Sequence, residues 1–148
     1  MLLPLPQALV NLIDSGFWPL TSEESSKQDS KPLVSRDKVK AFAPEENTIY
    51  FYPPPSFHTV GSQQKHGDFF WGYAWPTATE LDADKILLIG DFGHGADAPL
   101  ALNYCQDSAD PSVIRLHWTT DRSQEPMMTS TWIEVAPSFE AFIRMILD

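Results

Sequence analysis

The chain has 148 residues and a mass of 16.7 kDa, which is the size of one domain. Hydrophobic residues make up 43% of it, enough to build a core and too many for a disordered chain. The formal net charge of −10 argues against nucleic acids and anionic membranes as partners, since both would repel it. We therefore expect a single domain over residues 1–148 that binds neither.

Cysteine content and the N-terminal sequence bear on the compartment. Cys105 is the one cysteine, so an internal disulfide and a CxxC motif are both excluded, which indicates a reducing environment. The N-terminal stretch MLLPLPQALVNLI has no positively charged leader region, and its apolar run is too short for a membrane span. We therefore expect a cytoplasmic protein.

Two helices are predicted in the first third of the chain. Apolar residues recur at helical spacing from Leu5 onward, and Gly16 is placed to end that helix. Ser35 is a suitable N-cap for a second, shorter helix, which Pro44 does not allow to continue.

Between and after these helices the pattern predicts strands and polar loops. Strands are expected over residues 48–52 and 68–73, the second with Phe69, Trp71 and Tyr73 on one side. The polar segments 21–30 and 56–67 are expected to be loops, the first of them flexible.

The second half of the chain contains four more apolar segments of strand length, at 86–89, 100–104, 113–118 and 131–135. In the third, apolar side chains alternate with Arg115 and His117, the pattern of a sheet with one face in water. Ser138 can cap a closing helix whose apolar side docks on the sheet. Strands joined by loops, with helices at both ends, predict an α+β domain with a mostly antiparallel sheet.

The segment KILLIGDFGHGADAPLALNY, residues 85–104, is the most distinctive. It reads as a strand, a short loop of glycines and aspartates, and a second strand. Gly90, Gly93 and Gly95 stand where a turn between strands often requires positive φ or close backbone approach. Asp91-Phe92-Gly93 matches a kinase tripeptide, but no other kinase motif precedes it. We interpret the three glycines as a structural frame.

Three segments of the C-terminal part together resemble the SUKH superfamily: IGDFGHGADAPLALNY, VIRLHW and WIEVAPSFEAFIRMIL. The superfamily includes bacterial immunity proteins of polymorphic toxin systems and a fungal cell-wall assembly regulator. The resemblance covers roughly Lys85 to Leu147, and the N-terminal helix more loosely. It implies a non-enzymatic domain that binds a protein, such as a cognate toxin encoded nearby.

Acidic residues are dense around the glycine loop. Seven acids and one base, Lys85, lie between Glu80 and Asp110. Concentrated negative charge would speed encounter with a basic nuclease toxin, although an acidic surface also simply keeps a protein in solution. The candidate partner-binding residues are Asp82, Asp84, Asp91, His94, Asp97, Asp107 and Asp110.

An enzyme is the alternative interpretation. Asp91 and Asp97 would form an acid and base pair with His94 as a proton shuttle, but aspartates in glycine-rich turns more often bind backbone amides. The four histidines lack the spacing of a metal site. We therefore expect no enzymatic activity, no cofactor and no metal. A small acidic hydrolase or metal-dependent enzyme centred on this loop is the alternative.

Overall fold

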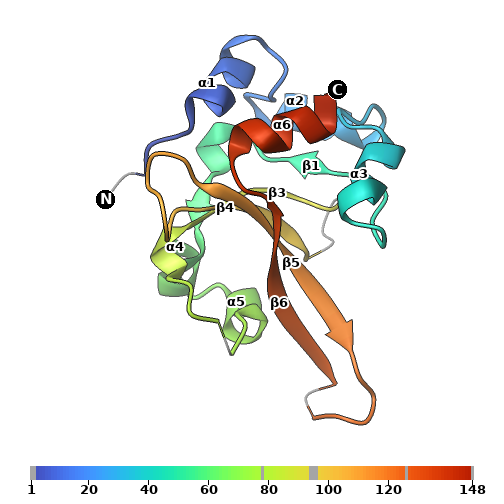
Figure 1. Cartoon of the computed structure of the whole chain (residues 1–148), viewed down its shortest axis with the longest axis vertical. Coiled ribbons are helices and arrows are strands. Elements are labelled where there is room, and N and C mark those ends of the chain that lie inside the picture. Colours follow the sequence, from blue (N-terminus) through green and yellow to red (C-terminus); the bar gives the residue numbers. More distant parts are fainter. Residues whose placement is uncertain (1–2, 78, 94–96, 126, 148) are drawn as a thin grey trace.

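The computed structural model describes residues 3–77, 79–93, 97–125 and 127–147. Within them, antiparallel strands form one sheet in the order β1-β3-β4-β5-β6, and β2 also pairs with β3. The predicted α+β class, with a C-terminal helix packed on an antiparallel sheet, is confirmed (Figure 1). The strands are β1 (Tyr50–Phe51), β2 (His58–Thr59), β3 (Ile86–Asp91), β4 (Pro99–Asn103), β5 (Ser112–Thr120) and β6 (Met128–Ala136).

Helices cover both faces of this sheet, with α1 and α6 on one side and α4 and α5 on the other (Figure 1). None of the helices in the described ranges has both the length and the apolar character needed to cross a bilayer. The helices are α1 (Gln7–Asp14), α2 (Ser22–Ser26), α3 (Arg36–Phe42), α4 (Val60–Lys65), α5 (Phe69–Ala74) and α6 (Phe139–Leu147), with short 3-10 turns η1 (Lys27–Asp29), η2 (Pro54–Ser56) and η3 (Ala83–Lys85).

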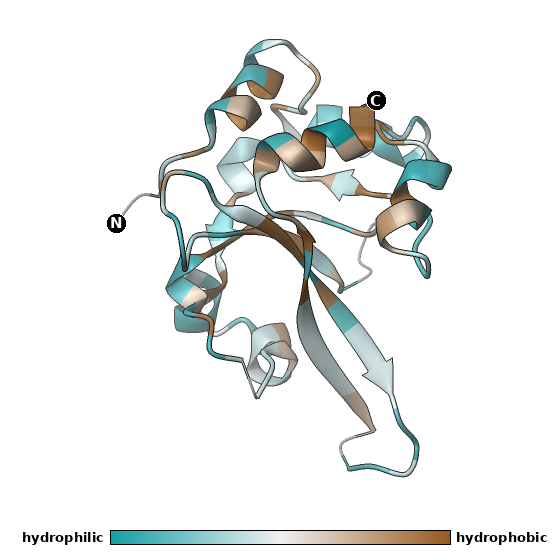
Figure 2. Ribbon diagram, viewed as in Figure 1, coloured by the Kyte–Doolittle hydropathy of each residue, from teal (hydrophilic) through white to brown (hydrophobic). Residues whose placement is uncertain are grey.

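The two faces of the sheet carry two separate cores. Leu87 and Ile89 of β3 point into the larger core, with Trp18 and the inner side of α6, whereas Leu88 points into the smaller core with Trp71 of α5. The central strands are therefore hydrophobic along much of their length (Figure 2). Such double coverage is why β3 reads as a continuous apolar run.

The predicted sheet with one face in water is wrong. Ile114 and Leu116 of β5 are buried in the smaller core, and Arg115, expected on the wet face, is only 5% exposed. Arg115 is buried because Glu45, just after α3, accepts its guanidinium hydrogen bond and lies 3.0 Å from it. The sequence of β5 therefore alternates like that of a strand with one face in water, although the charged side chain is buried next to a carboxylate.

The predicted loop over residues 21–30 is also wrong, because the segment is helical. The Thr21 hydroxyl caps α2 by accepting from the Glu24 N–H at 3.1 Å. Gln28 in η1 is buried, and its amide donates to the Phe51 carbonyl at 2.9 Å and accepts from the Phe51 N–H at 2.8 Å. Gln28 thus provides hydrogen-bond partners for the backbone of Phe51 in β1.

Residues 56–73 differ most from the sequence prediction. The expected loop 56–67 contains β2 and α4, and the expected strand 68–73 is helix α5. Asp68 caps α5 by accepting from the Phe70 N–H at 2.9 Å. As a consequence Phe69 and Tyr73, four residues apart, share one side of the helix, and Trp71 points inward.

Two glycines of the loop occupy positions that favour glycine. Gly93 has φ of 94°, a conformation that L side chains rarely adopt. At Gly90 an added Cβ would lie 2.8 Å from the Tyr50 carbonyl oxygen, because β1 approaches closely there. Gly95 lies outside the described residues.

We predict that Gly93→Ala lowers the free energy of unfolding by about 1–2 kcal/mol, because alanine is strained at positive φ. Gly72→Ala is the matched control: this glycine lies within α5 with open space around its Cα. There alanine should be neutral or stabilising by roughly 0.5–1 kcal/mol. Urea unfolding measures both, and equal effects at the two positions would contradict the assignment of strain to Gly93.

Candidate binding surface

Asp91 at the end of β3 is buried and turned into its own loop. Its Oδ1 accepts hydrogen bonds from the Phe92 N–H at 2.7 Å and the Ala98 N–H at 3.1 Å. Burial raises the pKa of Asp91, and the two N–H donors act in the opposite direction. With an exposed fraction of 7%, this carboxylate closes the loop and is not presented to a partner.

Asp97, near the end of the loop, is hydrogen-bonded to β5. Asp97 has φ of 57°, and its carbonyl accepts from Trp118 Nε1 at 2.9 Å. His94, the third member of the alternative catalytic group, lies outside the described residues. In the part of the chain that is described, no group of three or more His, Cys, Asp or Glu side chains could hold a metal ion.

The acids between residues 80 and 110 lie at two ends of the sheet. Asp91 and Asp97 flank one end of β3, which is a six-residue strand about 17 Å long. At its other end the Asp82 N–H lies 3.4 Å from Cys105 Sγ, which joins η3 to the segment after β4. The prediction that acidity concentrates around the glycine loop is therefore wrong, since four acids lie at this other end: Asp82, Asp84, Asp107 and Asp110.

These four acids also shape their own turns. Asp82 Oδ1 accepts from the Asp84 N–H at 3.0 Å, and Asp107 Oδ1 accepts from the Ala109 and Asp110 N–H groups. Asp84 is 3.9 Å from Lys65 Nζ, so a base lies next to them. The side chains are exposed, but they do not form an isolated acidic patch.

Two exposed and two half-buried aromatic side chains form a group on α5 and the adjoining part of β5. We call it the aromatic cluster: Phe69, Phe70, Tyr73 and Trp118. Phe69 is 87% exposed and Tyr73 60% exposed. Ring centroids are 6.1 Å apart for Phe69 and Tyr73, 5.5 Å for Phe70 and Tyr73, and 6.3 Å for Phe70 and Trp118. These rings form one contiguous surface.

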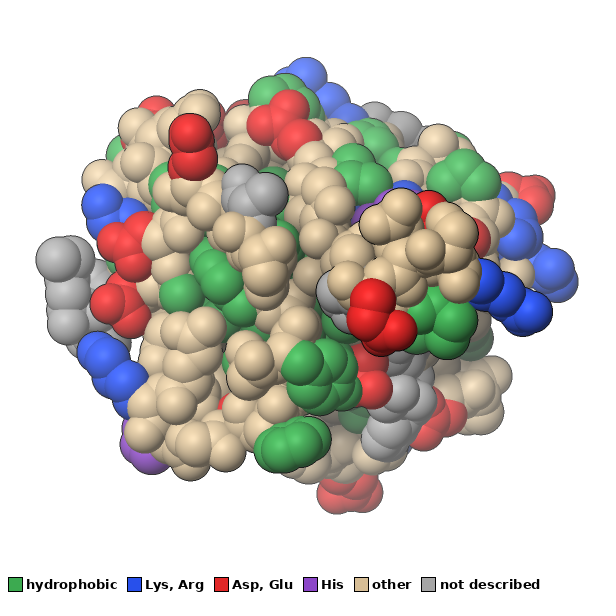
Figure 3. Space-filling model, turned by 90° about the horizontal axis from the view of Figure 1, so that it is seen from below, with side chains coloured by type: hydrophobic (Ala, Val, Ile, Leu, Met, Phe, Trp, Pro, Cys, Tyr) green, Lys and Arg blue, Asp and Glu red, His purple; other side chains and the backbone are tan. Residues whose placement is uncertain are grey.

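Helix α5 is held firmly to the sheet on its other side. Trp71 is 3% exposed, donates through Nε1 to Gln63 Oε1 at 2.7 Å, and stacks on Trp132 of β6 with centroids 6.0 Å apart. The Ser130 hydroxyl donates to the Ala74 carbonyl at the end of the helix. Seen from below the view of Figure 1, the surface of the molecule presents hydrophobic side chains next to acidic ones (Figure 3). The aromatic cluster is therefore held in place by the packing beneath it.

A second group of charges links β5 to the end of α3. Glu45 contacts Arg115 and also His117 Nδ1, at 2.8 Å, and the Arg115 guanidinium lies 5.7 Å above the centre of the Phe92 ring. Burial alone would raise the pKa of Glu45, but its own backbone N–H and the Arg115 charge hold it below the usual range. This group braces the glycine loop from within.

The sequence prediction missed the aromatic cluster, because the alternation of Phe69, Trp71 and Tyr73 was interpreted as a strand. Asp68 is the signal that identifies the helix, since an aspartate before an apolar run is a typical N-cap. Phe69 and Tyr73 then fall at i and i+4 on the outer side.

Comparison with protein-family models, with curated proteins and with solved structures finds no match to this chain.

We predict opposite outcomes for two substitutions at Asp91. Its raised pKa means that its contribution to stability is present below the unfolded pKa of about 3.9 and is lost as pH rises through the folded pKa. Asp91→Asn keeps an acceptor and removes the charge, so its stability relative to wild type should rise between about pH 4 and pH 7. Asp91→Ala leaves two N–H groups without their acceptor and should cost roughly 1–3 kcal/mol for each.

Urea unfolding at the two pH values measures both variants. If Asp91→Asn is as unstable as Asp91→Ala at pH 7, the loop requires the charge and this account of Asp91 is wrong.

Proposed function

We propose that the protein is a non-enzymatic binding domain that captures another protein through the aromatic cluster. The observation that carries this proposal is the exposure of Phe69 and Tyr73 on a helix whose inner side is firmly packed. Single exposed hydrophobic residues are common on protein surfaces, but contiguous rings are typical of binding surfaces. Aromatic side chains also supply much of the energy of protein interfaces.

The charge of the domain supports a basic partner. The net charge is −10, and acids flank the aromatic cluster: Asp68 caps α5, and Asp97 bonds to Trp118 through its carbonyl. Negative charge spread over the whole domain steers a basic protein toward it and raises the association rate.

The resemblance to the SUKH superfamily supports a more specific form of the proposal. The segments that resemble the superfamily are the glycine loop, the β5 segment VIRLHW and the C-terminal segment WIEVAPSFEAFIRMIL. An immunity protein in the bacterial cytoplasm would neutralise a toxin domain encoded by a neighbouring gene. A basic nuclease domain is the toxin that this charge fits best.

The test of the proposal is binding to the toxin domain encoded next to this gene. We expect Phe69→Ser with Tyr73→Ser to weaken binding about 100-fold, mainly through faster dissociation, because aromatic anchors dominate interface energy. Surface plasmon resonance measures both rates. Leu20→Ser with Leu147→Ser is the matched control, since these leucines are 45% and 41% exposed and lie outside the cluster. If the Phe69 and Tyr73 variant binds with the same affinity as the Leu20 and Leu147 control, the proposal is contradicted.

Charge should affect the association rate and not the dissociation rate. Replacing Asp82, Asp84, Asp107 and Asp110 by Asn should slow association at low salt and flatten its salt dependence. Because the charge is spread over the domain, neutralising Glu23, Asp37, Glu125 and Glu140, as Gln or Asn, should slow association to a similar degree. An unchanged association rate in both variants at low salt would refute electrostatic steering.

A further inference from the structure

Strand β6 is a long edge of the sheet. It is last in the strand order, pairs with β5, and has nine residues. Its pairing with β5 shifts register near Val135, and the stretch from Met128 to Glu134 pairs regularly. The outer side of an edge strand presents backbone N–H and C=O groups, and proteins usually guard such edges with lysine, proline or short length. The β6 sequence, MTSTWIEVA, has no lysine and no proline, and Glu134 is its one charged residue.

The opposite edge is guarded. Strand β1 has two residues, and Gln28 occupies the backbone groups of Phe51 as a neighbouring strand would. Ser25 adds a hydroxyl that donates to the same carbonyl at 2.7 Å. The two edges of one sheet therefore differ, and β6 is the one able to accept another strand.

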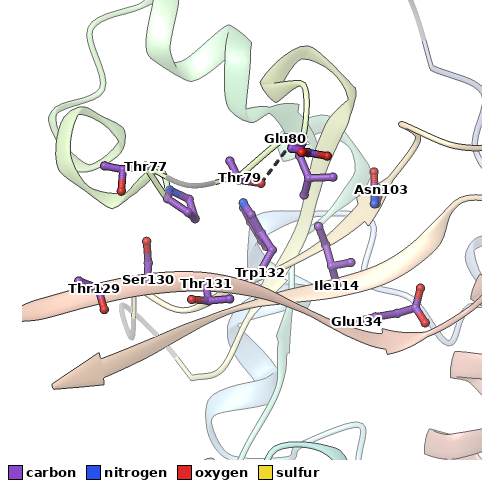
Figure 4. A pocket seen from close by; sticks show the side chains of 12 residues that line it. Thr77, Thr79, Glu80, Asn103, Ile114, Thr129, Ser130, Thr131, Trp132 and Glu134 are labelled. Atoms are coloured by element: carbon purple, nitrogen blue, oxygen red, sulfur yellow. Dashed lines mark hydrogen bonds between the residues drawn. The ribbon is translucent and has the colours of Figure 1, made fainter. Parts of the chain in front are cut away.

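A hollow of about 600 Å³ lies beside β6, between the strand and the segment that carries Thr77 and Thr79. Ser130 and Trp132 point from β6 toward that segment (Figure 4). Three successive residues of β6, from Thr129 to Thr131, line the hollow together. Asn103 of β4 and Ile114 of β5 line it too, so the hollow lies over one face of the sheet next to the β6 edge. Alternate side chains of a strand added at this edge would point over that face.

The charged side chains that line this hollow indicate which kind of group it could bind. Glu80 and Glu134 line it, and no lysine or arginine does so among the described residues. The hollow thus offers two carboxylates to a cationic side chain, with Trp132 beside them.

We propose that the β6 edge docks an extended, basic segment of a partner protein, which adds to the sheet as a further strand and places a Lys or Arg side chain in the hollow lined by Glu80 and Glu134. Backbone hydrogen bonds along β6 would supply affinity, and the hollow would supply preference for the basic side chain. The inference rests on the proposed function and names the form in which a partner is bound. Trp132 stacks on Trp71, so the edge adjoins the helix that carries the aromatic cluster.

A second copy of the chain is the other occupant that an open edge could accept. Each copy carries a net charge of −10, and pairing two β6 edges would bring two acidic hollows toward each other. Repulsion between like charges disfavours this arrangement, whereas a basic segment is attracted.

The test uses short random peptides displayed on phage and selected against the immobilised full-length chain. Selected peptides should carry Lys or Arg within an alternating strand-like pattern. In the amide spectrum of the protein, such a peptide should shift and slow the exchange of β6 residues, those from Thr129 to Trp132 above all. Glu80→Gln with Glu134→Gln should weaken peptide binding about tenfold, as measured by fluorescence anisotropy.

The matched control is Glu23→Gln with Glu125→Gln, which changes the net charge equally at exposed positions outside the hollow and should stay within about twofold of wild type. Selection of no peptide, peptides without basic residues, equal binding by both double variants, or spectral shifts outside β6 would each overturn the inference. So would β6 shifts that appear with protein concentration alone, since a second copy would then be the occupant. Because these peptides do not come from the toxin, failure here leaves the Phe69 and Tyr73 experiment to decide the proposed function separately.

Discussion

The central strands are apolar on both faces, and the rest of the structure depends on covering both. Alternate side chains of β3 enter different cores, with Ile89 in the larger and Leu88 in the smaller. Burying each such side chain contributes about 1.5–3 kcal/mol, so neither face of the sheet is stable in water. The terminal helices and Trp18 cover one face. The other face is left to α4 and α5, two helices of six residues each.

Helix α5 is anchored to the sheet by one side chain, and this bears on the surface that we propose binds a partner. Trp71 is the α5 side chain that anchors the helix, through Trp132 and Gln63. Phe69 and Tyr73 lie on the outer side, where most of their surface faces water. Exposed aromatic rings favour association. Their presence on a helix that is already fixed is best explained by a partner that covers them.

Sequence patterns predicted the elements whose signals are local and strong. The helix that ends at Gly16, the cap at Ser35, the apolar run of β3 and the closing helix after Ser138 all lie where periodicity and capping placed them. The predictions were wrong where a side chain contacts a residue that is distant in the sequence. Gln28 looks like a loop residue until its contact with Phe51 is known, and Arg115 looks exposed until Glu45 is placed beside it.

The candidate site was harder to predict for the same reason. Acids that are close in sequence separate to the two ends of β3, and Asp91 turns inward to bind Ala98. The aromatic cluster joins α5 to Trp118, residues about 45 positions apart, and no sequence pattern reports such a contact. The net negative charge of the domain does not depend on how these residues are arranged, so the sequence alone predicts it.

Both proposed contact regions flank α5: the aromatic cluster on its outer side, and the β6 edge beyond Trp132. Hydrogen exchange followed by mass spectrometry, on the chain alone and with the product of the neighbouring gene, which we propose to be a toxin domain, tests this placement most directly. We predict slower exchange of α5 and β6 in the complex, with β3 unchanged because it is already buried. Slower exchange confined to the end of the sheet near Asp82 and Asp107, with α5 unaffected, would contradict it.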